Sequence, residues 1–419
     1  MAIELSDITF TNRADVVPPF GVDEILNTGV ANTLAGNDTI TSTGTKFNLL
    51  RYLETSGTGF YNIGTLNTAD DNDIITGIHS PNESDPYPDN PIGLGNIRSY
   101  GIFNDRGTID TGDDNDIIIG ISQANRGIGD SSTFYARGIT SQEGTINTGN
   151  GNDTIMGTGT DTGIDISLYS TLDTGKGDDI ITGTSTDPYG TGFYNFYSTI
   201  DTGDGSDTIT GTGSGYGNGI LNFGVIINTG GGNDIITGTT TTGTGIANYS
   251  NSTIDTGNGN DIITGIGTDY GIYNQGTINT GNGNDFIIAD GGFARYGIYN
   301  LGGTIDTGNG NDSIIANGGF SSGGGSRRGI VFLGNGEDYI KGFGSCDFYG
   351  GNGNDTLELT PGRYTIERSE TGVIFTQPSS RNWENETTIM KTSEFEKLIA
   401  GSTIYDFSRL TNGQTIVVA

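Results

Sequence analysis

Aliphatic side chains recur along this chain at a fixed distance from a glycine-rich turn. Each turn ends in an aspartate, and two residues later comes an isoleucine or, in the last copy, a leucine. These residues are Ile40, Ile75, Ile118, Ile155, Ile181, Ile209, Ile236, Ile263, Ile287, Ile314, Ile340 and Leu357. A position kept apolar twelve times predicts the inward face of a repeated strand.

Two further apolar ladders accompany the first. One precedes the glycine turn, at Leu66, Ile109, Ile146, Leu172, Ile200, Ile227, Ile254, Ile278 and Ile305. The other follows a second turn, at Phe60, Ile102, Ile164, Phe193, Ile220, Ile246, Ile272 and Ile298. Three short segments of β-branched residues, repeated with turns between them, predict the coils of a parallel β-helix. We therefore expect an all-β, right-handed parallel β-helix or β-roll solenoid with a small β cap at its C-terminus.

The period of the repeat is set by the aspartates that end the glycine turns. They are Asp38, Asp73, Asp116, Asp153, Asp179, Asp207, Asp234, Asp261, Asp285, Asp312, Asp338 and Asp355. From Asp153 to Asp338 the spacing stays close to 27 residues, and the earlier, longer gaps contain insertions. The insertion between His79 and Arg98 holds four prolines, which predicts a loop.

Asparagines form a further column, directly after the third apolar ladder. Its members are Asn62, Asn104, Asn195, Asn222, Asn248, Asn274 and Asn300. Stacked asparagines hydrogen-bond along a solenoid axis, as in cross-β stacks, so we expect this column to be structural.

Charge and composition restrict the partners. The chain carries 50 acidic and 18 basic residues, a net charge of −32, which would repel nucleic acid and anionic membranes and attract cations. One cysteine, Cys346, and one histidine, His79, do not assemble a Cys/His zinc site or a Ser/His nucleophile pair. No apolar run is long enough for a transmembrane helix, and the first residues lack the apolar core of a signal peptide.

The glycine turns have the chemistry of a calcium site. The best copies read T-G-N-G-N-D-x-I-x, as in Thr280 to Ile288. Alternating glycines allow backbone carbonyls to turn toward one point, and the aspartate adds a carboxylate. Hard oxygen ligands of this kind suit Ca²⁺ better than Mg²⁺. We expect all twelve aspartates to be ligands; the alternative is a solvated turn in which Asp and Asn cap their own backbone.

These turns resemble the G-G-x-G-x-D-x-U-x nonapeptides of the RTX, or haemolysin-type, calcium-binding proteins, over roughly residues 31–358. The resemblance implies calcium between stacked turns, held by the motif aspartate and backbone carbonyls. Two departures are that threonine usually replaces the first glycine and that the motif occurs once per coil. A three-sided helix with one calcium column fits this spacing better than the family's flattened roll.

The resemblance also bears on the ends of the chain. We expect an N-terminal cap in residues 1–30, the calcium-binding repeats in 31–358, and a C-terminal cap in 359–419. RTX proteins leave the cell by type I secretion with an uncleaved C-terminal signal, and the ending Thr415 to Ala419 is similar to such signals. Export by that machinery would place the protein outside the cell or on its surface, folding when it meets calcium.

We expect a non-enzymatic scaffold, adhesin or layer component, with surface polysaccharide or copies of itself as partners. A polysaccharide lyase or epimerase would have to use the group Arg295, Arg327, Arg328, Tyr296 and Tyr299. A sugar-binding role would use a recurring set of tyrosines, namely Tyr189, Tyr194, Tyr216, Tyr249, Tyr270, Tyr273, Tyr296 and Tyr299. A threonine column resembles an ice-binding face, at Thr111, Thr148, Thr174, Thr202, Thr229, Thr256, Thr280 and Thr307.

Overall fold

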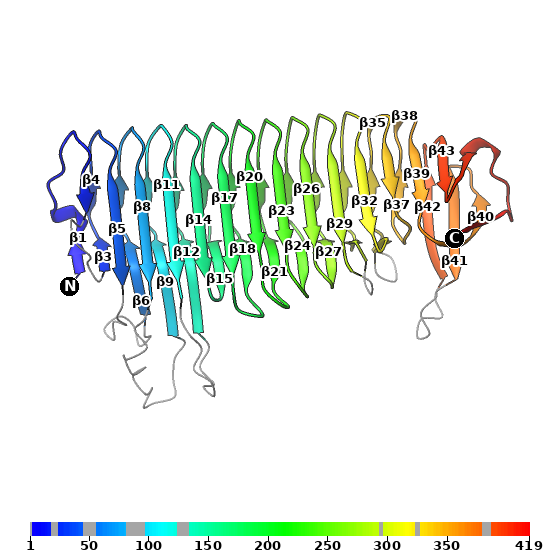
Figure 1. Ribbon diagram of the computed structural model, residues 1–419. Helices are drawn as coiled ribbons and strands as arrows, with labels where there is room; N and C mark the ends of the chain where they lie inside the picture. The colour runs from blue at the N-terminus through cyan, green and yellow to red at the C-terminus, as the bar shows by residue number, and fades with distance from the viewer. Residues whose placement is uncertain are drawn as a thin grey trace. The chain divides into compact units, whose positions relative to one another are not determined.

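The computed structural model describes residues 2–17, 24–44, 56–80, 97–123, 134–292, 296–322, 327–378 and 387–419. Over these residues the chain forms strands and two single-turn 3-10 helices, η1 (Leu5–Asp7) and η2 (Phe407–Arg409), and no α-helix. No helix in these ranges is long and apolar enough to cross a membrane. The chain divides into two compact units, residues 1–228 and 229–419, and each is a parallel β-solenoid, as predicted (Figure 1).

In the first unit each coil contributes one strand to each of three sheets. Sheet 1a runs in the order β1 (Ala2–Glu4), β3 (Glu24–Asn27), β6 (Ser56–Asn62), β9 (Ile97–Asp105), β12 (Phe134–Gln142), β15 (Thr162–Ser167), β18 (Thr191–Phe196) and β21 (Asn218–Phe223). Sheet 2a contains β4 (Val30–Asn32), β7 (Thr65–Asn67), β10 (Thr108–Asp110), β13 (Thr145–Asn147), β16 (Thr171–Asp173), β19 (Thr199–Asp201) and β22 (Ile226–Asn228). Sheet 3a contains β2 (Val16–Val17), β5 (Thr39–Gly44), β8 (Ile74–His79), β11 (Ile117–Ser122), β14 (Thr154–Gly159), β17 (Ile180–Ser185) and β20 (Thr208–Thr212).

The second unit repeats this arrangement. Sheet 1b contains β24 (Thr244–Asn248), β27 (Tyr270–Asn274), β30 (Ile298–Asn300) and β33 (Phe320–Ser321). Sheet 2b begins with β25 (Thr253–Asp255), β28 (Thr277–Asn279), β31 (Thr304–Asp306), β34 (Ile330–Phe332) and β37 (Asp347–Tyr349). Sheet 3b begins with β23 (Ile235–Thr239), β26 (Ile262–Ile266), β29 (Phe286–Asp290), β32 (Ser313–Asn317), β36 (Tyr339–Lys341) and β39 (Thr356–Leu359). Two turn strands, β35 (Asn335–Gly336) and β38 (Asn352–Gly353), also pair.

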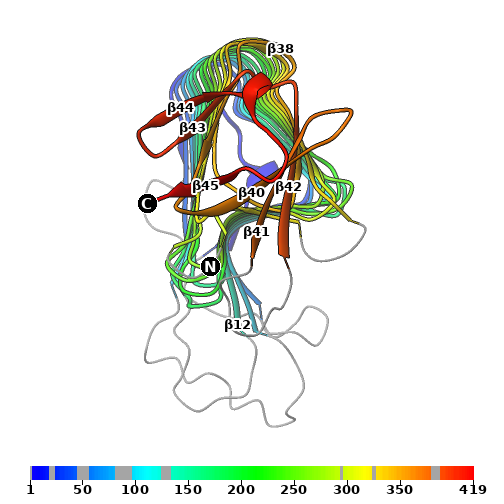
Figure 2. The same cartoon turned by 90° about the vertical axis from the view of Figure 1, so that its right-hand side faces the viewer.

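The C-terminal cap changes from parallel to antiparallel pairing. Its strands are β40 (Gly362–Arg368), β41 (Val373–Pro378), β42 (Thr387–Ser393), β43 (Lys397–Ala400), β44 (Thr403–Asp406) and β45 (Thr415–Val418). β42 continues sheet 2b, β43 continues sheet 3b, and β40 pairs with β41 in an antiparallel hairpin. Figure 2 shows the cap strands crossing the stacked coils of the second unit, so the open end of that stack is covered.

The core of each unit consists of the predicted apolar ladders. Ile109 pairs with Ile146 in sheet 2a and Ile118 with Ile155 in sheet 3a, and all four are at most 1% exposed. Strand pairing in register places like residues on like, so each ladder fills the interior with one repeated contact. The registers fix which side chains point outward.

The asparagine column is buried and structural, as predicted. Asn274 donates from Nδ2 to Oδ1 of Asn300 at 2.9 Å and to the carbonyl of Thr304 at 3.0 Å, and it accepts from Nδ2 of Asn248 at 2.9 Å. In the first unit Asn62 donates likewise to Asn104 at 2.7 Å. The proline-rich insertion predicted as a loop falls at 81–96, which lies outside the described residues.

Candidate functional site

The glycine turns of successive coils lie close against one another. In the second unit Gly257 has a φ of +80°, and a Cβ there would lie 1.7 Å from the carbonyl oxygen of Gly230 in the neighbouring turn. A side chain is therefore excluded both by backbone conformation and by space. The turns stack so closely that their polar atoms interact from coil to coil.

Part of the turn backbone is used in this stacking. The amide of Asn258 donates to the carbonyl of Gly230 at 2.9 Å, and the amide of Gly232 donates to the carbonyl of Asn258 at 2.7 Å. These two carbonyls bond to the adjacent turn, which differs from the expected cage of carbonyls pointing at one centre. A cation site in these turns depends instead on the groups that point inward.

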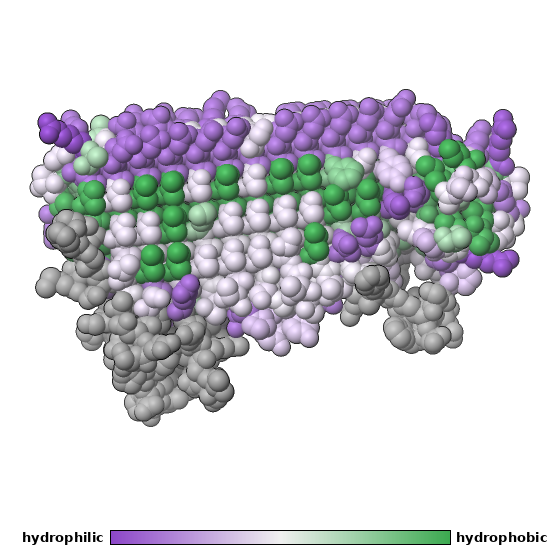
Figure 3. All heavy atoms as spheres, viewed as in Figure 1, coloured by the Kyte–Doolittle hydropathy of each residue, from purple (hydrophilic) through white to green (hydrophobic). Residues whose placement is uncertain are grey.

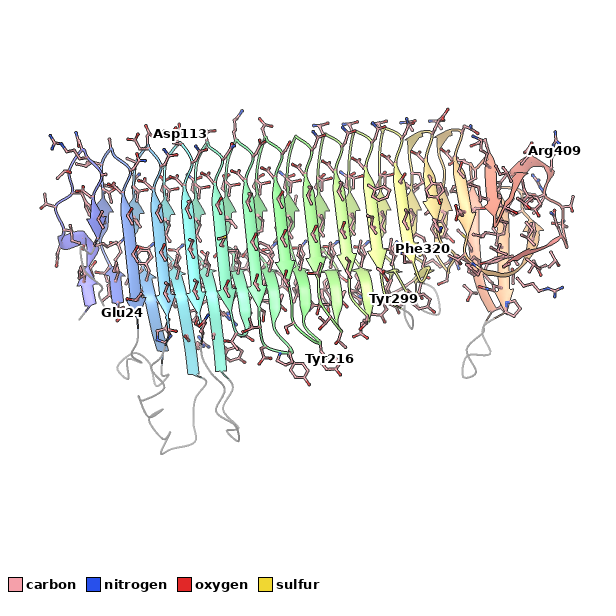
Figure 4. All side chains as sticks on the ribbon, in the orientation of Figure 1. Glu24, Asp113, Tyr216, Tyr299, Phe320 and Arg409 are labelled. Atoms are coloured by element: carbon pink, nitrogen blue, oxygen red, sulfur yellow. The ribbon has the colours of Figure 1, made fainter. Side chains whose placement is uncertain are left out.

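Asparagine and aspartate side chains add an exposed ladder on the outside of the turns. Asn309 donates to Asn282 at 2.6 Å, and Asn150 donates to Asp113 at 2.7 Å. Asp113 stands on the turn row and points to solvent (Figure 4). These contacts support the alternative, considered above, in which Asp and Asn stabilise the turns without a metal.

The motif aspartates themselves are buried, with at most 2% of each residue exposed. The structure arranges them as one column in each unit. The first column holds Asp38, Asp73, Asp116, Asp153, Asp179 and Asp207, and the second holds Asp234, Asp261, Asp285, Asp312, Asp338 and Asp355. Within a column the backbone amide of one aspartate donates to Oδ1 of the next, at 2.7 Å to 3.0 Å. All twelve predicted site residues thus share one environment.

Weak copies of the motif join the same column. The turn before Asp73 lacks the glycines, yet Ala69 and Asp71 take left-handed conformations with φ of +63° and +92°. The amide of Asp73 still donates to Oδ1 of Asp116 at 2.8 Å. The turn geometry is therefore set by the stack, and non-glycine residues adopt it at a cost of roughly 1–2 kcal/mol each.

The second carboxylate oxygen, Oδ2, is buried and makes no hydrogen bond in the following motif aspartates. These are Asp38, Asp73, Asp116, Asp153, Asp179, Asp261, Asp285, Asp312, Asp338 and Asp355. A buried carboxylate oxygen without a donor is unfavourable, and such an atom calls for a proton or a cation.

A threonine hydroxyl from the start of the same turn lies near most of these carboxylates and is itself buried. At Thr202 it donates to Oδ2 of Asp207 at 2.6 Å. The hydroxyls of Thr68 and Thr280 instead donate along the column, to the carbonyls of Thr111 and Thr307, at 3.3 Å each. In those turns the hydroxyl lies beside the carboxylate and partly offsets the rise in its pKa, while its hydrogen bond runs along the column.

Burial raises the pKa of these aspartates. Desolvation is the largest cause, and it raises the pKa of Asp116 to about 8 and that of Asp312 to about 7. Backbone amides and threonine hydroxyls lower the pKa in part, and at Asp207 it reaches about 6. Near neutral pH the carboxyl groups of Asp116, Asp207 and Asp312 can therefore exchange a proton for a cation.

Within the described ranges no group of three or more His, Cys, Asp or Glu side chains is placed to hold a metal. A cation in a column would have to combine one or two aspartates with threonine hydroxyl and backbone carbonyl oxygens. Those are the hard, uncharged oxygens that Ca²⁺ accepts alongside carboxylates. The unpaired Oδ2 atoms fit that donor set.

The structure corrects one expectation about the threonine column. Thr111, Thr148, Thr174, Thr202, Thr229, Thr256, Thr280 and Thr307 are at most 1% exposed, so the prediction that they resemble an ice-binding face is wrong. Their hydroxyls belong to the aspartate columns. The sequence contained the signal, because each stands five residues before a motif aspartate at the other end of a turn.

Five of the tyrosines proposed for sugar binding pack on one another in the second unit, namely Tyr249, Tyr270, Tyr273, Tyr296 and Tyr299. Tyr273 stacks on Tyr299 with ring centroids 5.6 Å apart and 14° between planes, so neighbouring rings cover the faces that a sugar would need. Arg328 bonds to Asp347 at 2.5 Å and to the carbonyl of Ile389 at 3.0 Å, joining a coil to the cap. Arg295 lies outside the described residues.

The fold and the columns define a class, a parallel β-solenoid with buried carboxylates stacked at one turn of each coil. No family model matches the chain, and no curated protein and no solved structure matches it.

Proposed function

We propose that this protein is a calcium-stabilised β-solenoid that acts as a structural or adhesive element outside the cell. The observation that carries the proposal is the pair of aspartate columns with unpaired, buried Oδ2 atoms. Each is a carboxylate oxygen buried without a hydrogen-bond donor, and a divalent cation between coils would supply its missing contact and neutralise the carboxylate. The net charge of −32 acts in the same direction by attracting cations.

Export of the chain would depend on the same link between calcium binding and folding. A chain whose folded state alone binds calcium is stabilised by RT ln(1 + [L]/Kd) at each site, so many sites give a steep response. Low calcium in the cytoplasm would leave the chain unfolded for a type I exporter, and calcium outside would fold it. Resemblance to RTX turns supports this route. A folded product made of identical stacked coils suits a scaffold or adhesin.

The test is urea unfolding of the purified chain, followed by circular dichroism, after chelation and then with added Ca²⁺ or Mg²⁺. We expect calcium, and not magnesium, to raise the unfolding midpoint or to restore β structure in the chelated chain. A chelated chain that is fully β and equally resistant to urea with or without calcium contradicts the proposal. In that case protons and the contacts between stacked turns hold the aspartate columns.

A further inference from the structure

The outward face of sheet 3a carries no charge. Six strands, β5, β8, β11, β14, β17 and β20, each point three side chains away from the core. Of these 18 side chains 11 are threonine, six are isoleucine and one is methionine. They are Thr39, Thr41, Thr43, Ile74, Thr76, Ile78, Ile117, Ile119, Ile121, Thr154, Met156, Thr158, Ile180, Thr182, Thr184, Thr208, Thr210 and Thr212. We call this set the threonine–isoleucine face.

None of these side chains is buried, and Ile74, Ile180 and Met156 are 36%, 45% and 38% exposed. Soluble proteins are designed with about 25–35% charged residues on their surfaces. In a chain with a net charge of −32, 18 neighbouring accessible positions without one charge are a marked departure. Figure 3 shows the face as pale and green rows below the purple band of turn residues.

The face is a regular two-dimensional array. β8, β11 and β14 pair in parallel over six residues each with no bulge, so Thr76, Ile119 and Met156 form one straight row. Neighbouring positions are about 4.8 Å apart across the strands and about 6.7 Å apart along them, two residues at a time. Such a grid of methyl and hydroxyl groups is regular in two directions, as an ordered layer of water molecules is.

The array is also rigid. Behind it, Gly77, Gly120, Gly157, Gly183 and Gly211 form an inward column on sheet 3a. A Cβ at Gly120 would lie 2.3 Å from the carbonyl oxygen of Gly138 in sheet 1a, so the two backbones are in direct contact. Threonine and isoleucine are β-branched, so their side chains populate few rotamers on this rigid backbone. A preorganised array loses little entropy when it binds an ordered surface.

We propose that the threonine–isoleucine face binds ice. The methyl groups order water and the hydroxyls hydrogen-bond to it at regular intervals, while the absence of charge avoids the desolvation that a lysine or glutamate would impose. The array is repeated over six coils, so it matches an extended crystalline surface and not a single small ligand. The proposal concerns a different face from the aspartate columns and does not depend on which cation occupies them.

The test is thermal hysteresis and ice-crystal shaping by the full-length, folded chain. The variant Thr182→Lys/Thr210→Lys places two charges in the centre of the face. The matched control, Thr171→Lys/Thr199→Lys, makes the same change on the outward side of sheet 2a, where both threonines are half-buried neighbours. We expect hysteresis from the wild type and the control, and a loss of about tenfold or more in the face variant, because the lysines must be desolvated against ice.

Circular dichroism must show that each variant is folded, and the single change Thr154→Lys serves if the double variant is not. A folded wild type that neither shapes ice crystals nor shows hysteresis overturns the proposal. Equal hysteresis in the face variant and the control also overturns it. A wild type without hysteresis that forms dimers, which only the face variant dissociates in sedimentation, identifies the face as a self-association surface and likewise overturns it.

Discussion

The hydroxyl of Thr202 donates a 2.6 Å hydrogen bond to Oδ2 of Asp207, across one glycine turn. In the second unit the corresponding hydroxyl of Thr280 donates to the carbonyl of Thr307 at 3.3 Å, and Oδ2 of Asp285 makes no hydrogen bond. The two turns show two ways of treating a buried carboxylate: a donor from the protein, or a position for a proton or cation. The predictions about the columns follow from this difference.

The variant Asp285→Asn tests whether the aspartate column requires a cation or only a side chain of this shape. The substitution removes the charge but keeps a side-chain oxygen for the backbone N–H of Asp261, which in the wild type donates to Oδ1 of Asp285 at 2.9 Å. Without calcium, we expect the variant to be as stable as the wild type or more so, because a desolvated charge is gone. The stabilisation by calcium should fall by about 2.7 kcal/mol, the value for one site at 100 times its Kd.

Asp306→Asn is the matched control, since Asp306 lies on the outward side of β31, where Asn279 occupies the same position in the preceding coil. Urea unfolding of both variants at fixed calcium measures the difference. An equal loss of calcium stabilisation in the two variants would show that calcium acts on the overall charge and not in the column.

Stability without calcium should fall as pH rises. Burial raises the pKa of Asp73 and Asp179 to about 7 and of Asp116 to about 8, against an ordinary value of 3.8. Between these values the unfolded chain has already lost protons that the folded chain retains, so the slope of unfolding free energy against pH is negative. The stabilisation from these raised pKa values is complete below about pH 4 and is lost by about pH 8.

Urea midpoints of the chelated chain at pH 5 and pH 8 measure this effect. With calcium bound the cation replaces the proton, so the difference between the two pH values should shrink. A chelated chain that is more stable at pH 8 than at pH 5 would show that the buried aspartates are ionised and satisfied in some other way.

The strands and the core were predictable because their signal repeats. Ile118, Ile155 and Ile181 recur two residues after an aspartate, and parallel pairing in register converts that repetition directly into a buried column. The asparagine ladder followed from the same reasoning. Repetition also located the twelve aspartates, although it did not say whether Oδ1 would face an amide or a metal.

The placement of the threonines was predictable from strand alternation, and the use of the turn carbonyls was not. Thr202 stands two residues after the buried Ile200, so both point inward, whereas Thr210 directly follows the buried Ile209 and points outward. The prediction that placed the threonine column on a surface did not apply this alternation. The carbonyls of Gly230 and Asn258 accept from amides of the adjacent turn, a contact that depends on how closely the coils stack and that no local sequence pattern shows.

Glycine at the stacked turns should be essential. Gly257→Ala places a Cβ 1.7 Å from the Gly230 carbonyl oxygen at a φ of +80°. The strain of the left-handed conformation is roughly 1–2 kcal/mol, and displacement of the neighbouring turn should bring the total loss of stability to about 4 kcal/mol. Gly413→Ala is the control, because Gly413 has a φ of +77° with no atom within 4 Å of the added Cβ. Gly413→Ala should lose only the roughly 1–2 kcal/mol of stability that the left-handed conformation costs. Similar losses of stability in the two variants would show that the turns can separate.

The asparagine ladder should contribute to stability whether or not calcium is bound. Asn274→Ala removes a side chain that is fully buried and that bonds to Asn248, Asn300, the Thr304 carbonyl and, at 3.2 Å, the Gly276 amide. The groups left behind stay buried without their partner, so we expect a loss of about 3–5 kcal/mol, since each unsatisfied group costs about 1–3 kcal/mol. The urea midpoint should fall by the same amount in chelator and in calcium, because the ladder lies on a different turn from the aspartates.

The control is Asn274→Ser, because serine occupies this column at Ser141. Serine retains one donor and one acceptor, so this variant should lose less stability. If the loss appeared only in calcium, the ladder and the cation sites would be a single cooperative network.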